Sequence, residues 1–560
     1  MKPASIRALN TVSAPDSHKG ECGASRLAAN FREIVTLEGQ TDPAISAQIY
    51  YPRIKRLANG KYILFHQDYR LGGNIYYSLS DDCRRFSPRQ KLFAARPVVR
   101  DDGEEDKLMY ATADAAVLPN GEILAVCSYR YSAGYKLDAK YGGLVMKRST
   151  NNGATFSEER QIYLGRNWEP SVLVLQSGEV QVYFSHTAPK FYLDKTVRTD
   201  SPIKTSSGTA IIRSYDGGET WSPKSDEPPY AAHRVTQSYI CTMENGTKCF
   251  TNQMATAVEL GDGTIAVATE SDMSNYTFKL TMSYSHDNWA RSLDIDEDGP
   301  ADKITGFDDG AGPYLAHFES GETILSYNLN GAQHIRTGDE QGRNFDAAHE
   351  IIAFGGRFGY WGSITVDNPH CLISAYPNIG EDRSTGTLLI DNDLMIGKFY
   401  LNHRIDCKPL TQIWAGNTDA LFFGSRSQAQ CTIRTAYDSE HVYVRADRLD
   451  RYLCEADSAE VQIRTGEDIY TMGANVQGRA WYKKNGTPCD WGAEFKNLVY
   501  GELDKWSGDE NGIVTIFSLP ISVLGGADRF EITASLKNFD GGDMIFDSLG
   551  GWFPVRVLKS

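Results

Sequence analysis

The sequence predicts an all-β protein in which a six-bladed β-propeller is followed by a β-sandwich domain. Three observations predict this fold: a hairpin pattern that recurs six times, a second turn motif between the hairpins, and a C-terminal segment where the repeat stops but strand patterns continue. The chain has 560 residues, of which 51 are glycine and 11% are aromatic. This composition is typical of strands joined by tight turns.

Each copy of the hairpin consists of an apolar strand, a turn that ends in glycine, and a second apolar strand. The sixth copy, residues 360–376, has Asn368-Pro369 in place of the glycine turn. The other copies span residues 51–66, 112–127, 169–184, 254–270 and 312–327, with turn glycines Gly60, Gly121, Gly178, Gly263 and Gly321.

The second motif has the pattern Ser-x-Asp-x-Gly-x-Thr-Trp. It is complete in residues 214–221, nearly complete in 149–156, and weaker around Asp81, in 283–289 and around Gly342. An aspartate in such a turn accepts hydrogen bonds from backbone N–H groups, and the glycine supplies a left-handed φ. We interpret these aspartates as structural residues that hold the turn by hydrogen bonds, rather than as metal ligands or catalytic groups.

Together the hairpin and the turn motif supply four strands, which make one propeller blade. The six copies place the propeller at residues 30–405, after an N-terminal extension of residues 1–29. Beyond it, residues 406–560 keep the period-two alternation of strands, most clearly in 431–450. We therefore expect a separate β-sandwich at the C-terminus.

Charge and cysteine usage restrict the partners of the protein. The net charge of −15 disfavours a nucleic-acid partner, and no apolar stretch is long enough to predict a membrane span. None of the ten cysteines has metal-site C-x-x-C spacing, whereas Cys241 and Cys249 flank a short loop that suits a disulfide. We therefore expect a secreted or periplasmic protein, although the sequence begins without a signal peptide.

Two glutamates are expected at one mouth of the propeller channel. The inner strand of each blade starts at that end and the second strand returns to it, so candidate residues lie just outside the hairpin. Glu169 lies nine residues before Gly178, and Glu270 lies seven residues after Gly263, on adjacent blades. Paired carboxylates are the groups with which a glycosidase protonates the leaving oxygen and attacks the sugar or activates water.

The same alignment brings further polar and aromatic side chains to this rim. Such side chains around paired acids are typical of a sugar pocket with stacking faces. We expect them to bind an oligo- or polysaccharide, and the chemistry requires no cofactor. The acidic segment 294–298 could hold a structural Ca²⁺, although acidic loops are more often solvated. The candidates are Arg53, His66, Asp114, His186, Tyr314, Tyr360 and Trp361.

The turn motif resembles the Asp-box, or bacterial neuraminidase repeat, of sialidase-like propellers. Segment 51–54 is similar to the motif that carries a carboxylate-binding arginine in sialidases, and segment 360–364 resembles the strand of their tyrosine nucleophile. However, Glu270 stands where their second arginine is expected, and Gln253 replaces the glutamate that assists their nucleophile. Because an acidic residue would repel a carboxylate sugar, a sialidase or related keto-acid glycosidase is only an alternative.

The segment Trp168-Glu169-Pro170 resembles a catalytic strand of the exo-arabinanases of glycoside hydrolase family 93, which are also six-bladed. The stretch from Gln253 to Glu270 resembles the strand pair that carries their other glutamate. This resemblance implies an exo-acting, retaining hydrolase of an arabinan-like polysaccharide. It implies Glu169 as nucleophile, Glu270 as acid/base and Tyr360 as a hydrogen-bonding partner, with Trp168 and Gln253 in the substrate pocket. The sequence itself does not order the two glutamate roles.

Segment 431–450 resembles family 9 carbohydrate-binding modules, which implies a sugar-binding sandwich. Trp481, Trp491, Trp506 and Trp552 could stack on sugar rings, although buried tryptophan is commoner. The leading hypothesis is a secreted, exo-acting glycoside hydrolase. A non-catalytic glycan-binding propeller is a further alternative, because a fold does not determine a function.

Overall fold

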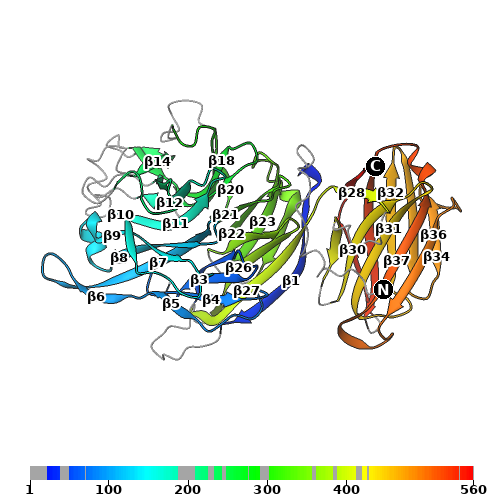
Figure 1. Ribbon diagram of the computed structural model, residues 1–560, viewed down its shortest axis with the longest axis horizontal. Coiled ribbons are helices and arrows are strands. Elements are labelled where there is room, and N and C mark those ends of the chain that lie inside the picture. Colours follow the sequence, from blue (N-terminus) through cyan, green and yellow to red (C-terminus); the bar gives the residue numbers. More distant parts are fainter. Residues whose placement is uncertain are drawn as a thin grey trace.

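Figure 1 shows two bodies, a propeller formed by the blue to yellow-green strands and a sandwich formed by the yellow to red strands. Both parts of the predicted fold class are therefore present. Within the residues described here, no helix is long and apolar enough to cross a membrane. The computed structural model describes residues 22–37, 49–69, 71–186, 208–224, 232–242, 248–274, 277–290, 302–355, 361–382, 387–410, 419–425, 428–540 and 543–558.

The propeller consists of six antiparallel sheets whose first strands contact one another in a closed ring. Blades one to three contain β2 (Tyr50–Arg56), β3 (Tyr62–Gln67), β4 (Ile75–Ser80) and β5 (Gln90–Phe93); β7 (Glu105–Val117), β8 (Ile123–Tyr131), β9 (Gly142–Ser149) and β10 (Arg160–Leu164), extended by β6 (Arg96–Val99); and β11 (Asn167–Val174), β12 (Val180–His186), β13 (Gly208–Ser214) and β14 (His233–Thr236).

Blades four to six follow the same order from the channel outwards. They contain β17 (Gln253–Glu259), β18 (Ile265–Ser274), β19 (Thr277–Ser285) and β20 (Lys303–Asp309); β21 (Ala311–His317), β22 (Thr323–Leu329), β23 (Ala332–Gly338) and β24 (Glu350–Phe354); and β25 (Ser363–Asn368), β26 (Cys371–Asp382), β27 (Thr387–Asn402) and β1 (Arg26–Thr36).

Blade six closes the ring with strands from both ends of the propeller. Strand β1 pairs antiparallel with β27, from Arg26 opposite Asn402 to Thr36 opposite Asp393. The propeller therefore begins at Arg26, inside the segment that the sequence assigned to an N-terminal extension. The sequence missed this strand because its partner lies at the far end of the repeat.

Hydrogen bonds to aspartate side chains hold the turns between the third and fourth strands, as the second motif predicts. In blade three, Asp216 Oδ1 accepts the backbone N–H groups of Glu219 at 3.0 Å and Thr220 at 2.8 Å. In blade one the corresponding acceptor is Asp82, whose Oδ1 lies 2.8 Å from the N–H of Arg84. The prediction of Asp81 at this position was wrong, because Asp81 is exposed and forms an ion pair with Lys61 instead.

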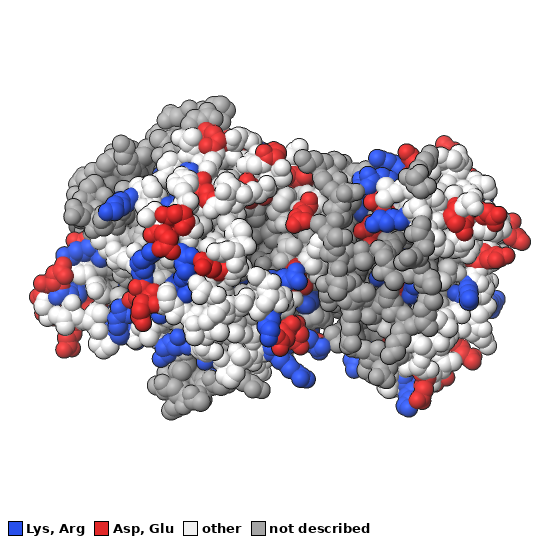
Figure 2. All heavy atoms as spheres, viewed as in Figure 1, with Lys and Arg blue, Asp and Glu red and all other residues white. Residues whose placement is uncertain are grey.

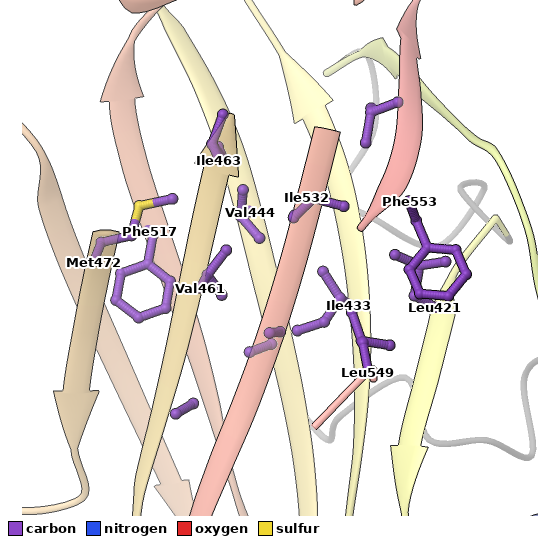
Figure 3. Close-up of a cluster of buried hydrophobic side chains, with 14 of the residues drawn as sticks. Leu421, Ile433, Val444, Val461, Ile463, Met472, Phe517, Ile532, Leu549 and Phe553 are labelled. Atoms are coloured by element: carbon purple, nitrogen blue, oxygen red, sulfur yellow. The ribbon is translucent and has the colours of Figure 1, made fainter. Parts of the chain in front are cut away.

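The C-terminal body is one large sheet that curls into two layers. Its core lies between the layers, where Val444 and Phe517 of one layer face Val461 and Ile532 of the other (Figure 3). Its strands are β28 (Ile405–Pro409), β29 (Leu421–Gly424), β30 (Ala429–Tyr437), β31 (His441–Tyr452), β32 (Ser458–Thr465), β33 (Asp468–Asn475), β34 (Ala480–Lys484), β35 (Thr487–Pro488), β36 (Glu494–Tyr500), β37 (Trp506–Pro520), β38 (Arg529–Asp540), β39 (Asp543–Ser548) and β40 (Phe553–Val557).

Charged side chains of both signs are interspersed over the face shown in Figure 2, where the described residues form no continuous basic surface. A hairpin of β15 (Ser238–Thr242) and β16 (Lys248–Thr251) places Cys241 opposite Cys249 along the backbone. Their side chains lie outside the described residues, so the disulfide stays a prediction.

Candidate active site

One backbone feature recurs at the same level of all six inner strands. In blades one to five the inner strand carries one residue with φ between 50° and 58°, nine positions before the turn glycine, and in blade six Trp361, with φ 65°, lies two residues before β25. In those five blades the residue lies at a break in the register with the second strand. We call the six residues the bulge ring: Tyr51, Thr112, Glu169, Met254, Gly312 and Trp361.

Only one member of the bulge ring is glycine. A left-handed conformation costs other residues about 1–2 kcal/mol each, so the five non-glycine members are strained. Glu169 belongs to this ring, and its backbone conformation is therefore determined by the repeat rather than by its own preference.

In the five blades with a glycine turn, the second strand supplies a matching position seven residues after that glycine. In blades one, three and four, the side chain at this position accepts the N–H of the next blade's bulge-ring residue. We call these contacts the blade latches. Thr112 donates to Gln67 Oε1 at 2.6 Å, Met254 donates to Ser185 Oγ at 3.0 Å, and Gly312 donates to Glu270 Oε2 at 2.6 Å.

Glu270 is therefore a latch residue with a carboxyl side chain, which is only 5% exposed. The equivalent position of the other blades with a glycine turn holds glutamine, serine or asparagine. A carboxyl group at this position exceeds what the latch alone requires.

Glu169 has a different electrostatic environment, although it lies on the neighbouring blade. Burial raises the pKa of Glu169 to about 7, against the opposing effects of a hydrogen bond from Ser185 and of the nearby Arg53 and Arg130. The hydroxyl of Ser185 lies 3.2 Å from Glu169 Oε2. The Glu169 carboxyl thus titrates near neutral pH, a condition that suits a general acid.

Tyr51 lies close to both glutamates. Burial raises the pKa of its hydroxyl well above the usual value, and the charges of Glu169 and Glu270 raise it further. Its ring stacks on Trp361 with 4.4 Å between centroids and an angle of 3°. Two carboxyl groups from adjacent blades therefore act on one phenol at the bulge ring.

Trp168 and Arg130 form a wall beside Glu169. The guanidinium carbon of Arg130 lies 3.8 Å from the centre of the Trp168 ring, a close cation–π contact. Tyr135 meets the same tryptophan edge-on, with 5.8 Å between centroids. On the next blade Gln253 lies opposite Glu270 in the strand register.

Arg53, Asp114 and Tyr314 lie deeper in the channel than the sequence alignment suggested. Each follows the bulge ring by two residues along its strand, which corresponds to about 7 Å. Lys55 Nζ lies 2.9 Å from Asp114 Oδ1 and donates to the Tyr314 hydroxyl at 2.8 Å. The side chains of Lys55, Asp114 and Tyr314 line a cavity of about 240 Å³.

Arg53 connects blade one to blade six. Its Nη1 donates to the backbone carbonyls of Pro52, Trp361 and Gly362 at 3.1, 2.7 and 3.2 Å. These bonds from Nη1 tie blade one to blade six at the closure of the ring.

The two histidines are bound within their own blades. His66 is 1% exposed and stacks on Tyr76, with 5.6 Å between ring centroids. His186 Nδ1 lies 2.7 Å from Arg234 Nη2. Burial lowers the pKa of each imidazole to about 3, so both are neutral. None of these contacts joins either histidine to the glutamates.

Two sequence predictions cannot be placed. Tyr360 and the acidic segment 294–298 lie outside the described residues. Among the residues that are described, no group of three or more His, Cys, Asp or Glu side chains could hold a metal ion.

Sequence reasoning missed Tyr51, Arg130 and Ser185. A signal existed for two of them: Tyr51 has the same offset from its turn glycine as Glu169, and Ser185 has the same offset as Glu270. Arg130 lies two positions beyond this offset, and nothing in the repeat distinguishes it.

No family model and no curated protein matches the chain. A protein of unknown function from Dyadobacter fermentans has a TM-score of 0.47 at 12% identity, covering 67% of this chain and 99% of that one. The NanB sialidase of Streptococcus pneumoniae has a TM-score of 0.44 at 12% identity, covering 64% and 70%. The sialidase of Trypanosoma rangeli has a TM-score of 0.42 at 10% identity, covering 91% and 96%.

Proposed function

We propose that this protein is an exo-acting glycoside hydrolase that cleaves a neutral, arabinan-like polysaccharide at the bulge-ring end of its channel. The observation that carries the proposal is the pair of carboxyl groups, Glu169 and Glu270, which both influence the Tyr51 phenol but lie in different surroundings. Burial raises the pKa of Glu169 to about 7, and Glu270 accepts the Gly312 N–H. A glycosidase uses paired carboxyl groups in different environments as its acid and its nucleophile or base.

The raised pKa of Glu169 favours it as the acid, which leaves Glu270 as the nucleophile. In this assignment Glu169 gives a proton to the glycosidic oxygen as the bond to the anomeric carbon breaks, and the carboxylate of Glu270 attacks that carbon. Water then displaces Glu270 and returns a proton to Glu169. This order reverses the one implied by the resemblance to family 93.

A neutral sugar is favoured over a carboxylate sugar. Two carboxyl groups, Glu169 and Glu270, lie at the site, and three backbone carbonyls engage Nη1 of Arg53. Arg130 covers one face of the Trp168 ring, so a sugar would stack on the opposite face.

The test is product analysis on linear arabinan, branched arabinan, other pectic side chains and a sialoside. We expect release of a mono- or disaccharide from arabinan by the wild type. Glu169→Gln and Glu270→Gln should each reduce the rate at least about 10²-fold, because each variant lacks a catalytic carboxyl group.

The melting temperatures of further variants distinguish a loss of catalysis from a loss of the blade latch. Glu270→Gln keeps an oxygen that can accept the Gly312 N–H, so its melting temperature should stay near that of the wild type. Glu270→Ala should melt lower, by an amount similar to that of Gln67→Ala, which removes the corresponding latch of blade one. Turnover that persists in both glutamine variants would exclude the two-carboxyl mechanism. Binding without turnover would indicate a glycan-binding propeller, and turnover on the sialoside would indicate a sialidase.

A further inference from the structure

The outer face of the C-terminal sheet contains a hollow of about 300 Å³ across β32, β34, β38 and β39. Its centre is one row of the strand register, in which each residue lies opposite the next on a neighbouring strand. We call this feature the sheet hollow. The row consists of Trp481, Gly473, Glu460, Ser535 and Ser548.

The small residues of this row create the hollow. Glycine and serine present little side-chain volume at three of its five positions, while the bulky Trp481 stands at one end. Phe546 lines the same hollow from a neighbouring position of β39 and is 59% exposed.

Trp481 lies flat on the sheet because its cross-strand neighbour is glycine. A Cβ on Gly473 would come within 2.2 Å of the indole ring, so any other residue would displace the ring. The indole Nε1 donates to Glu460 Oε2 at 2.8 Å. Gln462 Nε2 donates to the other carboxylate oxygen, Oε1, at 3.1 Å. Both oxygens of Glu460 thus orient side chains that line the hollow.

The lining matches the chemistry of a sugar ring. A pyranose or furanose has an apolar C–H face, which suits an aromatic plane, and a rim of hydroxyl groups, which suits carboxylate, amide, ammonium and hydroxyl partners. The sheet hollow offers both: Trp481 and Phe546 supply aromatic faces, and Glu460, Lys537 and Ser535 supply polar groups.

We propose that the sheet hollow is a saccharide-binding site that holds an internal or terminal sugar of a polysaccharide. It is separate from the propeller channel and does not depend on hydrolysis there. Its function would be to retain the chain on a polymer.

Native gel electrophoresis in gels that contain debranched arabinan, xylan, mixed-linkage β-glucan or galactomannan tests this proposal. The full chain carries Glu169→Gln, so that the polymer is not consumed. We expect retardation by at least one polymer, and a loss of about tenfold or more in affinity for Trp481→Ala and Phe546→Ala added to this background.

Leu498→Ala is the matched control. Leu498 is 40% exposed on β36 of the same domain and does not line the sheet hollow, so this variant should keep the parental affinity. Phe546 is 59% exposed, so its replacement should leave the melting temperature unchanged even if Trp481→Ala lowers it. The proposal fails if no polymer retards the parent, or if Phe546→Ala binds as tightly as the parent. Because the assay measures retention only, it is informative even if the chain hydrolyses nothing.

Discussion

Glu169 and Glu270 occupy different positions of one repeat and therefore have different surroundings. Glu169 is a bulge-ring residue that accepts the Ser185 hydroxyl, whereas Glu270 is a latch residue that accepts the backbone N–H of Gly312 on the next blade. Burial raises the pKa of Glu169 to about 7, although its hydrogen bonds and the nearby arginines oppose the shift. Two identical side chains thus acquire different partners through backbone geometry.

The raised pKa of Glu169 predicts a pH-dependent effect on stability. The folded state keeps the proton up to about pH 7, whereas the unfolded chain releases it near 4.5, so stability falls as the pH rises through this window. Glu169→Gln removes the penalty. Its melting temperature should exceed that of the wild type by about 2 °C or more at pH 8 and by less at pH 4.

Differential scanning calorimetry at both pH values measures this difference. Glu158→Gln, a change at an exposed glutamate, is the control and should show no such dependence. An equal effect of Glu169→Gln at both pH values would contradict the raised pKa.

At the scale of single residues, the sequence predicts where the two glutamates lie but not which side chains surround them. The repeat places Glu169 and Glu270 by their offsets from turn glycines, since those offsets recur in every blade with such a turn. It placed Arg53 too high in the channel, because an alignment by spacing does not distinguish successive levels of one strand. Arg130 could not be found, since its contact with Trp168 depends on how two blades pack.

The turn between the third and fourth strands of a blade connects that blade to its neighbour. Gly218 has a φ of 92°, and a Cβ at this position would lie 2.9 Å from Leu124 Cδ1 of blade two. Gly60 has a similar φ of 81°, but a Cβ added there would meet no atom within 4 Å. Alanine variants at these two positions therefore distinguish the free-energy cost of backbone strain from the cost of disturbed packing between blades.

Gly60→Ala should cost about 1–2 kcal/mol, from the left-handed conformation alone. Gly218→Ala should cost about 1 kcal/mol more, because the methyl group must displace Leu124. Urea denaturation of the two variants and the wild type measures the difference. Equal losses would show that the turn of blade three does not contribute to packing between blades.

Glycine turns made the blades predictable, because only a few residue types tolerate a positive φ. Blade six departs from this pattern with Asn368-Pro369, yet its apolar strands on both sides still identified it. The strain of the bulge ring gave no such signal, since five of its six positions hold residues other than glycine. Tertiary contacts such as the blade latches stabilise those conformations.

Closure of the whole ring depends on the N-terminal strand. Deleting residues 1–36 removes β1 and leaves one edge of β27 unpaired in blade six. Deleting residues 1–21 keeps the whole of β1. We expect the shorter deletion to melt like the full chain, and the longer one to lose the cooperative transition of the propeller while the sandwich stays folded.

Limited proteolysis followed by mass spectrometry distinguishes the outcomes. The longer deletion should yield a protected fragment that begins near residue 405, the start of β28. A propeller that resists protease without β1 would show that the other three strands of blade six suffice for closure.

The closing strand also has a consequence for biosynthesis. Residue 26 leaves the ribosome early, but its partner at position 402 is made only after every other blade. Contacts so distant along the chain make folding slow, and unpaired strand edges promote aggregation in the meantime. The nascent propeller therefore stays open at one side until translation has passed its last blade, and during that interval it depends most on chaperones.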